Sequence, residues 1–366
     1  MKLKHLSTAM ILATLPATGV FAAALDRSGQ SISAFLQPGN YFEAGLSVLD
    51  ADVSGTTKAN YPNAALPLLS NTSVGEMADS YQFAHAALKL QLADQLSFGL
   101  IYDQPFGAKA TYSTDTAKLP AALPGAAAAL QGQGAFHNGT QGTSVEVETQ
   151  NLSMILGFQP NKNLNFYAGP VYQTVKGNIQ LRGTAYGGSA TFGGYNADIK
   201  ETGDIGWLAG AAYQIPEIAL KASVTYRSEI DHKIDVNETI LSGVPGVGVI
   251  NYTDAQTEIT TPQSVNLDFQ TGIMANTVAF ANLRWVNWKD FSIRPNKFGQ
   301  LSQHPVVVGS TGKPAGFDLV AYTDDQYSVT AGVGRKLNDQ WAGNVSVGWD
   351  SGAGNPVPTL GPTEGY

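Results

Sequence analysis

Short stretches in which apolar and polar residues alternate recur along most of the chain. In residues 278–288, for example, one set of alternating positions holds Asn282 and Arg284, and the interleaved set holds Leu283 and Trp285. Successive side chains of a β-strand point to opposite faces, so this stretch predicts a strand with an apolar face and a face that carries Asn and Arg. The face with Asn and Arg is the candidate for the inside of a barrel.

These strand patterns come in pairs that are joined by very short turns, and long polar or Gly-rich loops separate the pairs. The short turns are Ala93-Asp94-Gln95, Pro160-Asn161-Lys162-Asn163, Pro216-Glu217, Ala275-Asn276 and Asn338-Asp339-Gln340. They lie roughly 55 to 65 residues apart, which leaves room for two membrane-length strands and one long loop. In a periplasmic β-sandwich we would not expect short turns to alternate regularly with long loops. The pattern therefore predicts an all-β fold, a transmembrane outer-membrane β-barrel.

The number of strands and the end of the chain do not fit a closed barrel. Counting from residues 41–53 and 80–92 gives about eleven strands, whereas single-chain bacterial barrels have an even number. The last residues, SGAGNPVPTLGPTEGY, have the composition of an outer loop. We therefore expect the barrel to be C-terminally incomplete and to contain an open edge.

The N-terminus has the features of an export signal. A basic start, Met1-Lys2-Leu3-Lys4-His5, precedes an apolar run from Leu6 to Phe21 and three alanines. The run is short for a membrane anchor and is interrupted by polar residues, so we expect residues 1–24 to be a cleaved signal peptide. Residues 25–40 have no membrane-facing alternation and are expected to form a hatch inside the barrel, which would comprise residues 41–366.

Composition narrows the class of protein. The 366 residues include 40 Gly, 15 Tyr and 15 Phe but no Cys, and only 14% are charged. The lack of Cys excludes thiol nucleophiles, thiolate metal sites and disulfides. The net charge of -8 argues against a nucleic-acid partner. A mean hydropathy of -0.07 suits a barrel, although a soluble periplasmic protein would have the same value.

The five tryptophans lie near the ends of the expected strands. Interfacial anchoring explains this placement better than ligand binding does, because Trp is enriched where a membrane meets water. The tryptophans are Trp207, Trp285, Trp288, Trp341 and Trp349.

Several linked segments resemble the FadL family of outer-membrane transporters for long-chain fatty acids, which includes toluene and xylene channels. They are LSFGLIYDQPFGAK, GWLAGAAYQIPEIALKASVTYRSEI, TPQSVNLDFQTGIMANTVAFANLRWVNWKDF and NPVPTLGPTEGY. The resemblance implies a barrel of about fourteen strands, an N-terminal hatch and sideways release of the ligand through a strand kink. It also implies uptake of long-chain fatty acids or other hydrophobic small molecules. Residues 25–40 lack the Asn-Pro-Ala motif of the best-known members.

Catalytic patterns are poor. Four histidines of the expected mature chain, His85, His137, His232 and His304, are far apart in sequence, and neither H-E-x-x-H nor G-x-S-x-G occurs. We therefore expect no enzymatic activity, no metal and no cofactor. An outer-membrane lipase with a triad assembled in space stays open as an alternative.

Transport of an amphipath requires an apolar capture surface, an apolar path and a cation for a head group. The loop 106–142 is the candidate capture surface, with a short helical hairpin that would expose Leu119, Leu123 and Leu130. These leucines could equally pack the loop onto the barrel. Arg227 and Glu229 fit a structural ion pair in the wall. The candidate ligand-binding residues are Phe35, Leu36, Phe106, Leu119, Leu123, Leu130, Phe136, Lys176, Arg182 and Arg294.

Other functions remain open at this stage. A general diffusion porin needs a water-filled lumen lined by opposing charges, whereas the inward-facing candidates here mix polar and apolar groups. A surface adhesin would use the outer loops. For the channel we expect a monomer in the bacterial outer membrane. Its partners would be the hydrophobic ligand and the surrounding outer-membrane lipid and lipopolysaccharide.

Overall fold

The computed structural model describes residues 25–50, 52–59, 67–123, 125–188, 191–240, 243–244, 248–338 and 340–354. The expected signal peptide, residues 1–24, lies outside the described residues, and so does the segment 355–366. Within the described residues, no helix has the length and apolar character needed to cross a membrane.

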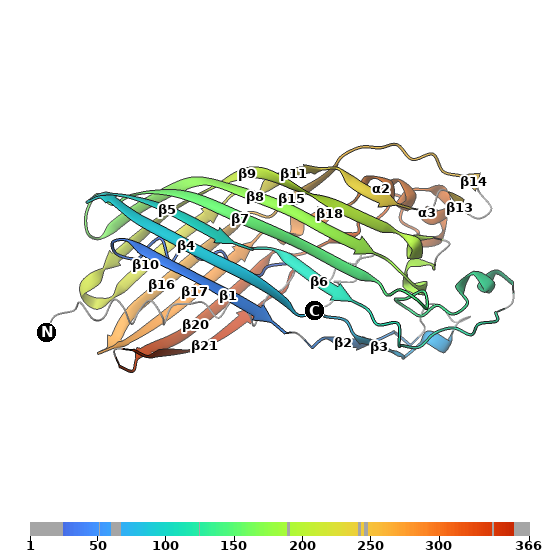
Figure 1. Ribbon diagram of the computed structural model, residues 1–366, viewed down its shortest axis with the longest axis horizontal. Helices are drawn as coiled ribbons and strands as arrows, with labels where there is room; N and C mark the ends of the chain where they lie inside the picture. The colour runs from blue at the N-terminus through green and yellow to red at the C-terminus, as the bar shows by residue number, and fades with distance from the viewer. Residues whose placement is uncertain are drawn as a thin grey trace.

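One large antiparallel sheet dominates the molecule, and its tilted strands curl around an interior (Figure 1). Among the described residues the sheet has 13 strands, and its path runs β1-β4-β5-β7-β8-β9-β10-β16-β17-β20-β21, with β6 beside β7 and β12 beside β9. The strands are β1 (Tyr41–Leu49), β4 (Tyr81–Ala93), β5 (Leu96–Asp103), β6 (Gly107–Thr111), β7 (Ser144–Phe158), β8 (Leu164–Gln180), β9 (Asn196–Ile215), β10 (Leu220–Arg227), β12 (Val236–Thr239), β16 (Ser264–Met274), β17 (Thr277–Val286), β20 (Gln326–Lys336) and β21 (Ala342–Asp350).

All five expected short turns join neighbouring strands of this path, so the hairpin prediction is confirmed. The hairpins are β4–β5, β7–β8, β9–β10, β16–β17 and β20–β21. At the β16–β17 turn Asn276 has a φ of 59°, a left-handed conformation that Asn tolerates better than most residues. Residue 339 of the last turn lies outside the described residues. The path contains the expected eleven strands.

Smaller elements form the loops at the opposite end of the strands (Figure 1). The strands and helices of these loops are β2 (Ser54–Thr56), β3 (Ser73–Glu76), β11 (Ile230–Ile234), β13 (Gly243–Val244), β14 (Gly248–Val249), β15 (Thr257–Thr261), β18 (Ser292–Ile293), β19 (Val320–Ala321), α2 (Asn296–Ser302) and α3 (Pro305–Thr311). The 3-10 turns are η2 (Pro67–Leu69), η3 (Gly125–Leu130), η4 (Thr184–Tyr186), η5 (Phe192–Gly194), η6 (Pro216–Ile218) and η7 (Trp288–Asp290), of which η6 lies in a short turn.

The two faces of the sheet differ as the alternation predicts. On β17, Arg284 is buried and Asn282 lines an interior cavity, whereas Leu283 is exposed on the outer face. On β7, Leu152, Met154, Leu156 and Phe158 are likewise exposed at every second position. An outer face of exposed large apolar side chains is typical of strands that lie in lipid. The expected inward face of β17 is therefore confirmed.

Strand lengths are uneven around the sheet. β9 has 20 residues and β8 has 17, whereas β1 has 9 and β10 has 8. About ten tilted residues suffice to cross a bilayer. The long strands therefore extend well beyond the membrane at the end that carries the long loops.

The N-terminal segment, residues 25–40, packs against the inner face of the sheet. Phe35 is fully buried, and its ring meets that of Tyr167 on β8 edge to face, with 5.7 Å between ring centroids. Lys89 on β4 and Lys221 on β10 donate from Nζ to the main-chain oxygens of Gln37 and Leu36. Side chains from distant strands of the sheet thus hold one short segment inside.

Among the described strands, the ladder has two interruptions toward the long-loop end. β5 and β6 are separated by residues 104–106, and β4 pairs with β5 only from Ala86 onward. On the other side, β9 pairs with β10 from Leu208 to Ile215 and with β12 from Asn196 to Ile199, so residues 200–207 form no ladder toward that neighbour. β11 turns away and pairs with β15. Both interruptions lie toward the long-loop end of the strands.

The sheet has two edges in the part of the chain that the structure describes. There, β1 pairs with β4 and β21 pairs with β20, and neither has a second partner.

The placement of the tryptophans is only partly as expected. Trp207, Trp341 and Trp349 are exposed, in keeping with a place at the membrane surface. Trp288 is 0% exposed, so the expectation of an interfacial anchor is wrong for this residue. It follows β17 in η7, turns inward and donates from Nε1 to Gln326 Oε1 at 2.7 Å.

Candidate functional site

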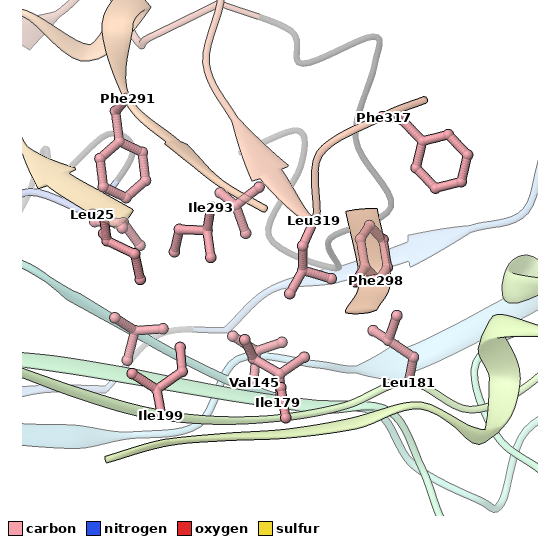
Figure 2. Packing of buried hydrophobic residues seen from close by; sticks show 14 of the residues in the cluster. Leu25, Val145, Ile179, Leu181, Ile199, Phe291, Ile293, Phe298, Phe317 and Leu319 are labelled. Carbon is pink, nitrogen blue, oxygen red and sulfur yellow. The ribbon is translucent and has the colours of Figure 1, made fainter. Parts of the chain in front are cut away.

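An apolar chamber occupies the interior at the long-loop end. Figure 2 shows two groups of side chains that face each other there, one from β7, β8 and β9 and one from residues 291–319 together with Leu25. We call the chamber the space lined by Leu25, Phe106, Val147, Thr149, Val175, Ile199, Ile259, Thr261, Pro262, Trp288, Phe291 and Ile293. Its free volume is about 10 Å³, so these side chains nearly fill it. An apolar guest would have to displace some of them.

Aromatic rings form one end of the chamber. Phe106 lies edge to face with Trp288 at 5.3 Å between ring centroids, and Trp288 packs in the same way on Phe291 at 5.1 Å. The Phe106 N–H donates to Thr149 Oγ1 at 2.9 Å, which fixes the ring at the break between β5 and β6. Aromatic rings of this kind offer a large apolar contact area with few rotatable bonds.

A polar layer closes the chamber on the side of the short turns. Arg284 is the centre of this layer and donates from Nε to Asp26 Oδ2 at 2.7 Å, from Nη2 to Gln30 Oε1 at 3.0 Å and from Nη1 to Asn266 Oδ1 at 2.7 Å. Both members of the Asp26–Arg284 ion pair are almost fully buried. Removal of one partner from such a pair would leave a buried charge without a counter-charge and would strongly destabilise the fold. The N-terminal segment is therefore held at its start by charge and at its end by the two lysines.

The turn at Gly29 and Gln30 gives the segment its bend. Gly29 has a φ of 62° and Gln30 a φ of 50°. The left-handed region costs a residue with a side chain about 1–2 kcal/mol. Arg227 Nη2 donates to the Gln30 carbonyl at 3.2 Å and Ser264 Oγ donates to Gln30 Oε1 at 3.1 Å. These bonds to the wall hold Gln30 in a conformation that it rarely adopts otherwise.

A polar cavity of about 150 Å³ lies below this layer, between the N-terminal segment and β10, β16, β17, β20 and β21. Its wall carries both signs of charge, from Lys221 and Arg284 and from Asp268 and Asp350. The interior is therefore divided into an apolar compartment at the long-loop end and a polar compartment at the short-turn end, with the N-terminal segment between them.

Side-chain amides form a further polar cluster beside the chamber. Gln173 on β8 accepts at Oε1 from Thr261 Oγ1 and lies 2.9 Å from His232 Nε2, while its Nε2 donates to Asn151 Oδ1 at 2.8 Å. All four residues are buried. This cluster lines a small cavity next to the chamber.

The expected apolar site residues separate into two groups. Phe106 lines the chamber, and Phe136 packs against the same core cluster. Phe35 and Leu36 belong to a second apolar cluster, which the N-terminal segment forms with the inner face of the sheet, and Leu36 also lines the polar cavity. Phe35 and Phe106 therefore lie in different apolar clusters.

The outer loop differs from the expectation. Leu119 is only 1% exposed, and Leu123 and Leu130 are half-buried, so the expected exposed leucine surface is wrong for Leu119. The expected helical hairpin is replaced by a single 3-10 turn, η3, and by a bridge between Lys118 and Gly134. The Leu119 N–H donates to the Gln133 carbonyl at 2.9 Å, so the loop folds back on itself at the buried Leu119.

The same loop contains a buried histidine. His137 is fully buried, and its Nδ1 accepts from the Gly139 N–H at 3.1 Å. Burial lowers the pKa of His137 below its usual value of 6.5. The neutral imidazole therefore belongs to this loop conformation.

The cations that were expected to bind a head group already form ion pairs or hydrogen bonds with other residues of the chain. Lys176 lies on the outer face of β8 and pairs with Glu148 at 2.9 Å, and Arg294 pairs with Asp318 at 2.6 Å in an outer loop. Arg182 is buried and donates to Gln141 Oε1, Asn196 Oδ1 and the main-chain oxygens of residues 181 and 195. Burial lowers the pKa of Arg182 from its usual value. The structure does not bring these cations together.

Sequence reasoning placed Arg284 on the inward face of its strand but missed the other cations that face the interior. Arg227 was expected to pair with Glu229, but it points inward to Gln30 and Ser153 while Glu229 is exposed, so this pairing is wrong. Lys89, Lys221 and Arg284 also face inward. Their alternation with apolar neighbours was a usable signal for Arg284. Nothing in the sequence showed that all four would contact residues 26–37.

Comparison with known families identifies one match. Residues 30–343 match the sequence profile of the family described as outer membrane protein transport protein (OMPP1/FadL/TodX). No curated protein sequence matches the chain.

Solved structures with a similar fold come from the same kind of protein. The Ralstonia pickettii toluene transporter TbuX is 13% identical, with a TM-score of 0.54 over 92% of this chain and 85% of that one. The Pseudomonas putida toluene transporter TodX is 13% identical, with a TM-score of 0.54 over 92% and 82%. A Pseudomonas aeruginosa FadL homologue is 17% identical, with a TM-score of 0.53 over 86% and 71%. At these identities the likeness establishes the fold.

Proposed function

The chain belongs to the FadL/TodX family of outer-membrane transporters of hydrophobic compounds in Gram-negative bacteria, and from this premise we propose that it takes up long-chain fatty acids or other hydrophobic small molecules. Two of the similar structures are named as toluene transporters, so aromatic hydrocarbons fall within the proposed range. We propose that the cargo is captured at the outer loops, passes into the apolar chamber above the N-terminal segment and leaves sideways into the membrane.

The apolar chamber is the observation that carries this proposal. Its lining is almost entirely aliphatic and aromatic, and the hydroxyl groups of its polar members, Thr149 and Thr261, already donate to the Phe106 carbonyl and to Gln173 Oε1. Burying apolar surface is favourable by about 25 cal/mol per Å², so such a chamber attracts a hydrophobic guest and rejects a hydrated ion. A general porin would instead need water and charge along its whole interior.

The N-terminal segment is proposed to act as the hatch beneath the chamber. Leu25 contributes to the chamber lining, and Asp26 and Gln30 are bonded to Arg284 in the polar layer. A guest that displaces Leu25 therefore pushes directly on the residues that anchor the segment. Among the expected ligand-binding residues, we propose that Phe106 and Phe136 contact the cargo on entry and that Phe35 and Leu36 hold the hatch.

A pair of substitutions on one strand tests the proposal. Val175→Asp places a carboxylate in the chamber, and Asn178→Asp places one on the exposed outer face of β8. In a Gram-negative host without its own hydrophobe channel, uptake of labelled oleate and toluene should fall with the first variant and remain with the second. The milder Val175→Thr variant should give an intermediate loss.

Other outcomes point to other functions. Outer-membrane assembly of each variant is checked by its heat-modifiable migration in gels, and uptake is expressed per assembled protein. If the unmodified protein lets small sugars into liposomes as readily as hydrophobes enter cells, the porin alternative is correct. If Val175→Asp leaves hydrophobe uptake unchanged, the cargo does not pass through the chamber.

A further inference from the structure

We propose that the small polar cavity beside the apolar chamber binds one hydroxyl group of the cargo, so that hydrophobic alcohols and phenols are the preferred cargo. This inference rests on the proposed function, because it names the class of hydrophobic compound that the chamber accepts. Four observations carry it: the position of the cavity, its size, the spare hydrogen-bonding capacity of the residues around it, and its balance of charge.

The polar cavity lies directly beside the apolar chamber. Phe106, Thr261 and Pro262 line both spaces. Asn151 and Gln173 line the cavity but not the chamber. A guest whose apolar body lies in the chamber is therefore next to a group of polar side chains. A polar substituent on this guest can enter the cavity while the apolar body keeps its contacts with the chamber.

The size of the cavity suits a single oxygen atom. Its volume is about 10 Å³. On the same scale, a space that holds one water molecule measures about 10–15 Å³. A hydroxyl group is about as large as one water molecule, whereas a carboxylate carries two oxygen atoms and needs more room. The cavity therefore fits a hydroxyl group better than it fits the head group of a fatty acid.

Gln173 in the wall of the cavity keeps one N–H group for a guest. Its Oε1 accepts from Thr261 Oγ1 and lies 2.9 Å from His232 Nε2. Its Nε2 donates to Asn151 Oδ1 at 2.8 Å. A carboxamide nitrogen has two N–H groups, and among the described residues only this one acceptor engages them. The second N–H is a donor that a guest oxygen can use.

The same cluster of side chains also has spare acceptors. Thr261 Oγ1 gives its only hydrogen to Gln173 and accepts no hydrogen bond from the part of the chain that the structure describes. His232 Nε2 faces the Gln173 oxygen, which assigns the proton to this nitrogen and makes Nδ1 an acceptor. Nδ1 is buried and has no partner among the described residues. A hydroxyl group both donates and accepts, so it matches this cluster, whereas a carboxylate only accepts.

The charges around the cavity are balanced without a guest. Arg227 is the charged residue among the described residues that line it, and its guanidinium donates to the Gln30 carbonyl and to Ser153 Oγ. The carboxylate of Asp103, which is also buried, interacts electrostatically with Arg227. A carboxylate guest would therefore add an unbalanced charge to a buried site, which is costly. A hydroxyl group adds none.

The two threonines of the chamber give a matched test. Thr261→Val removes the hydroxyl group that the cavity shares with the chamber. The control Thr149→Val removes a hydroxyl group that is engaged with the Phe106 main chain as donor and as acceptor. The probes are toluene, p-cresol and p-toluate, which share one ring and differ in one substituent. Their binding is measured to protein in lipid nanodiscs, with the binding to empty nanodiscs subtracted.

At neutral pH p-cresol is uncharged, and we expect it to bind the unmodified protein about tenfold more tightly than p-toluate, or better. Thr261→Val should weaken the binding of p-cresol about tenfold and that of toluene by less than about twofold. Thr149→Val should change both affinities by the same factor. Gln173→Met, which removes the amide from the cavity, should again weaken p-cresol more than toluene. Heat-modifiable migration in gels confirms that each variant is folded.

Three results would overturn the inference, and one of them would also overturn the proposed function. Equal effects of Thr261→Val on p-cresol and toluene would show that the cavity does not bind the hydroxyl group. Tighter binding of p-toluate than of p-cresol, abolished by Arg227→Gln, would make the cavity a carboxylate site. In both cases the proposed function would stand. Absence of toluene binding, together with absence of oleate and toluene uptake by cells, would overturn the proposed function and the inference with it.

Discussion

Removing the carboxylate of Asp26 should free the front of the N-terminal segment while the rear stays in place. The Arg284 charge would remain buried, and removal of one partner from a buried ion pair costs about 3–5 kcal/mol. Arg284 keeps Asn266 Oδ1 and Gln30 Oε1 as acceptors, which places Asp26→Ala at the lower figure. About 3 kcal/mol corresponds to more than a 100-fold rise in the detached population.

Thiol labelling measures this population directly. Leu25→Cys reports on the front of the segment and Ala34→Cys on the rear, and both positions are buried. Asp26→Ala should accelerate maleimide labelling at position 25 by about 100-fold. At position 34 the rate should change little, because Lys221 still holds the Leu36 carbonyl.

Two further variants complete this test. Adding Arg284→Met to Asp26→Ala should slow labelling at position 25 again, because no buried charge is left without a partner. Asp231→Ala removes an exposed carboxylate from β11 and should leave both rates unchanged. Equal acceleration at positions 25 and 34 in Asp26→Ala, or none at either, would refute the reasoning.

Three other substitutions or conditions have defined outcomes. Trp288→Ala should lower the free energy of unfolding in lipid vesicles, measured by urea titration, by about 3–5 kcal/mol, against about 1 kcal/mol or less for exposed Trp341→Ala; equal losses would contradict the packing. Because burial lowers the pKa of His137, the loop should keep its full stability above the usual value of 6.5 and lose it as the pH falls below that value; hydrogen exchange of residues 133–143 measures this, and His137→Gln should remove the dependence. Arg182→Gln should reduce uptake of a fatty acid and of an uncharged hydrophobe by the same factor, since its guanidinium is bonded to loop atoms; a loss confined to the acid would assign it to the head group.

Local patterns predicted the sheet well. Short turns and period-2 alternation depend on neighbouring residues, so the hairpins and the inward direction of Arg284 could be predicted from sequence. The orientation of Lys176 could also have been predicted, because Val171, Gln173 and Val175 face inward and the next residue must face outward.

The interior could not be predicted in the same way. Lys89 and Lys221 lie on strands far apart in sequence, and their common target, residues 36–37, lies in a segment without regular structure. The alternation in residues 278–288 puts Trp288 on the same face as Arg284, but its place after the end of the strand suggested an interfacial anchor; in η7 it instead packs inside and donates to Gln326. Leu119 is buried because its loop folds on itself, a contact that depends on Gln133 fourteen residues later. Contacts of this kind depend on tertiary packing, which alternation does not encode.

The unequal strand lengths affect the free-energy barrier along the route that is proposed for the cargo. A tilted strand of 20 residues such as β9 rises about 50 Å, roughly twice the height of the apolar band, so we infer that about half of it stands in the hydrated layer outside the apolar band. The free energy of a hydrocarbon chain rises by about 0.8 kcal/mol for every methylene that is exposed to water in that layer. For a ten-carbon chain this amounts to a barrier of about 8 kcal/mol. With an apolar interior that begins above the apolar band, the cargo could cross this hydrated layer without exposing its methylenes to water.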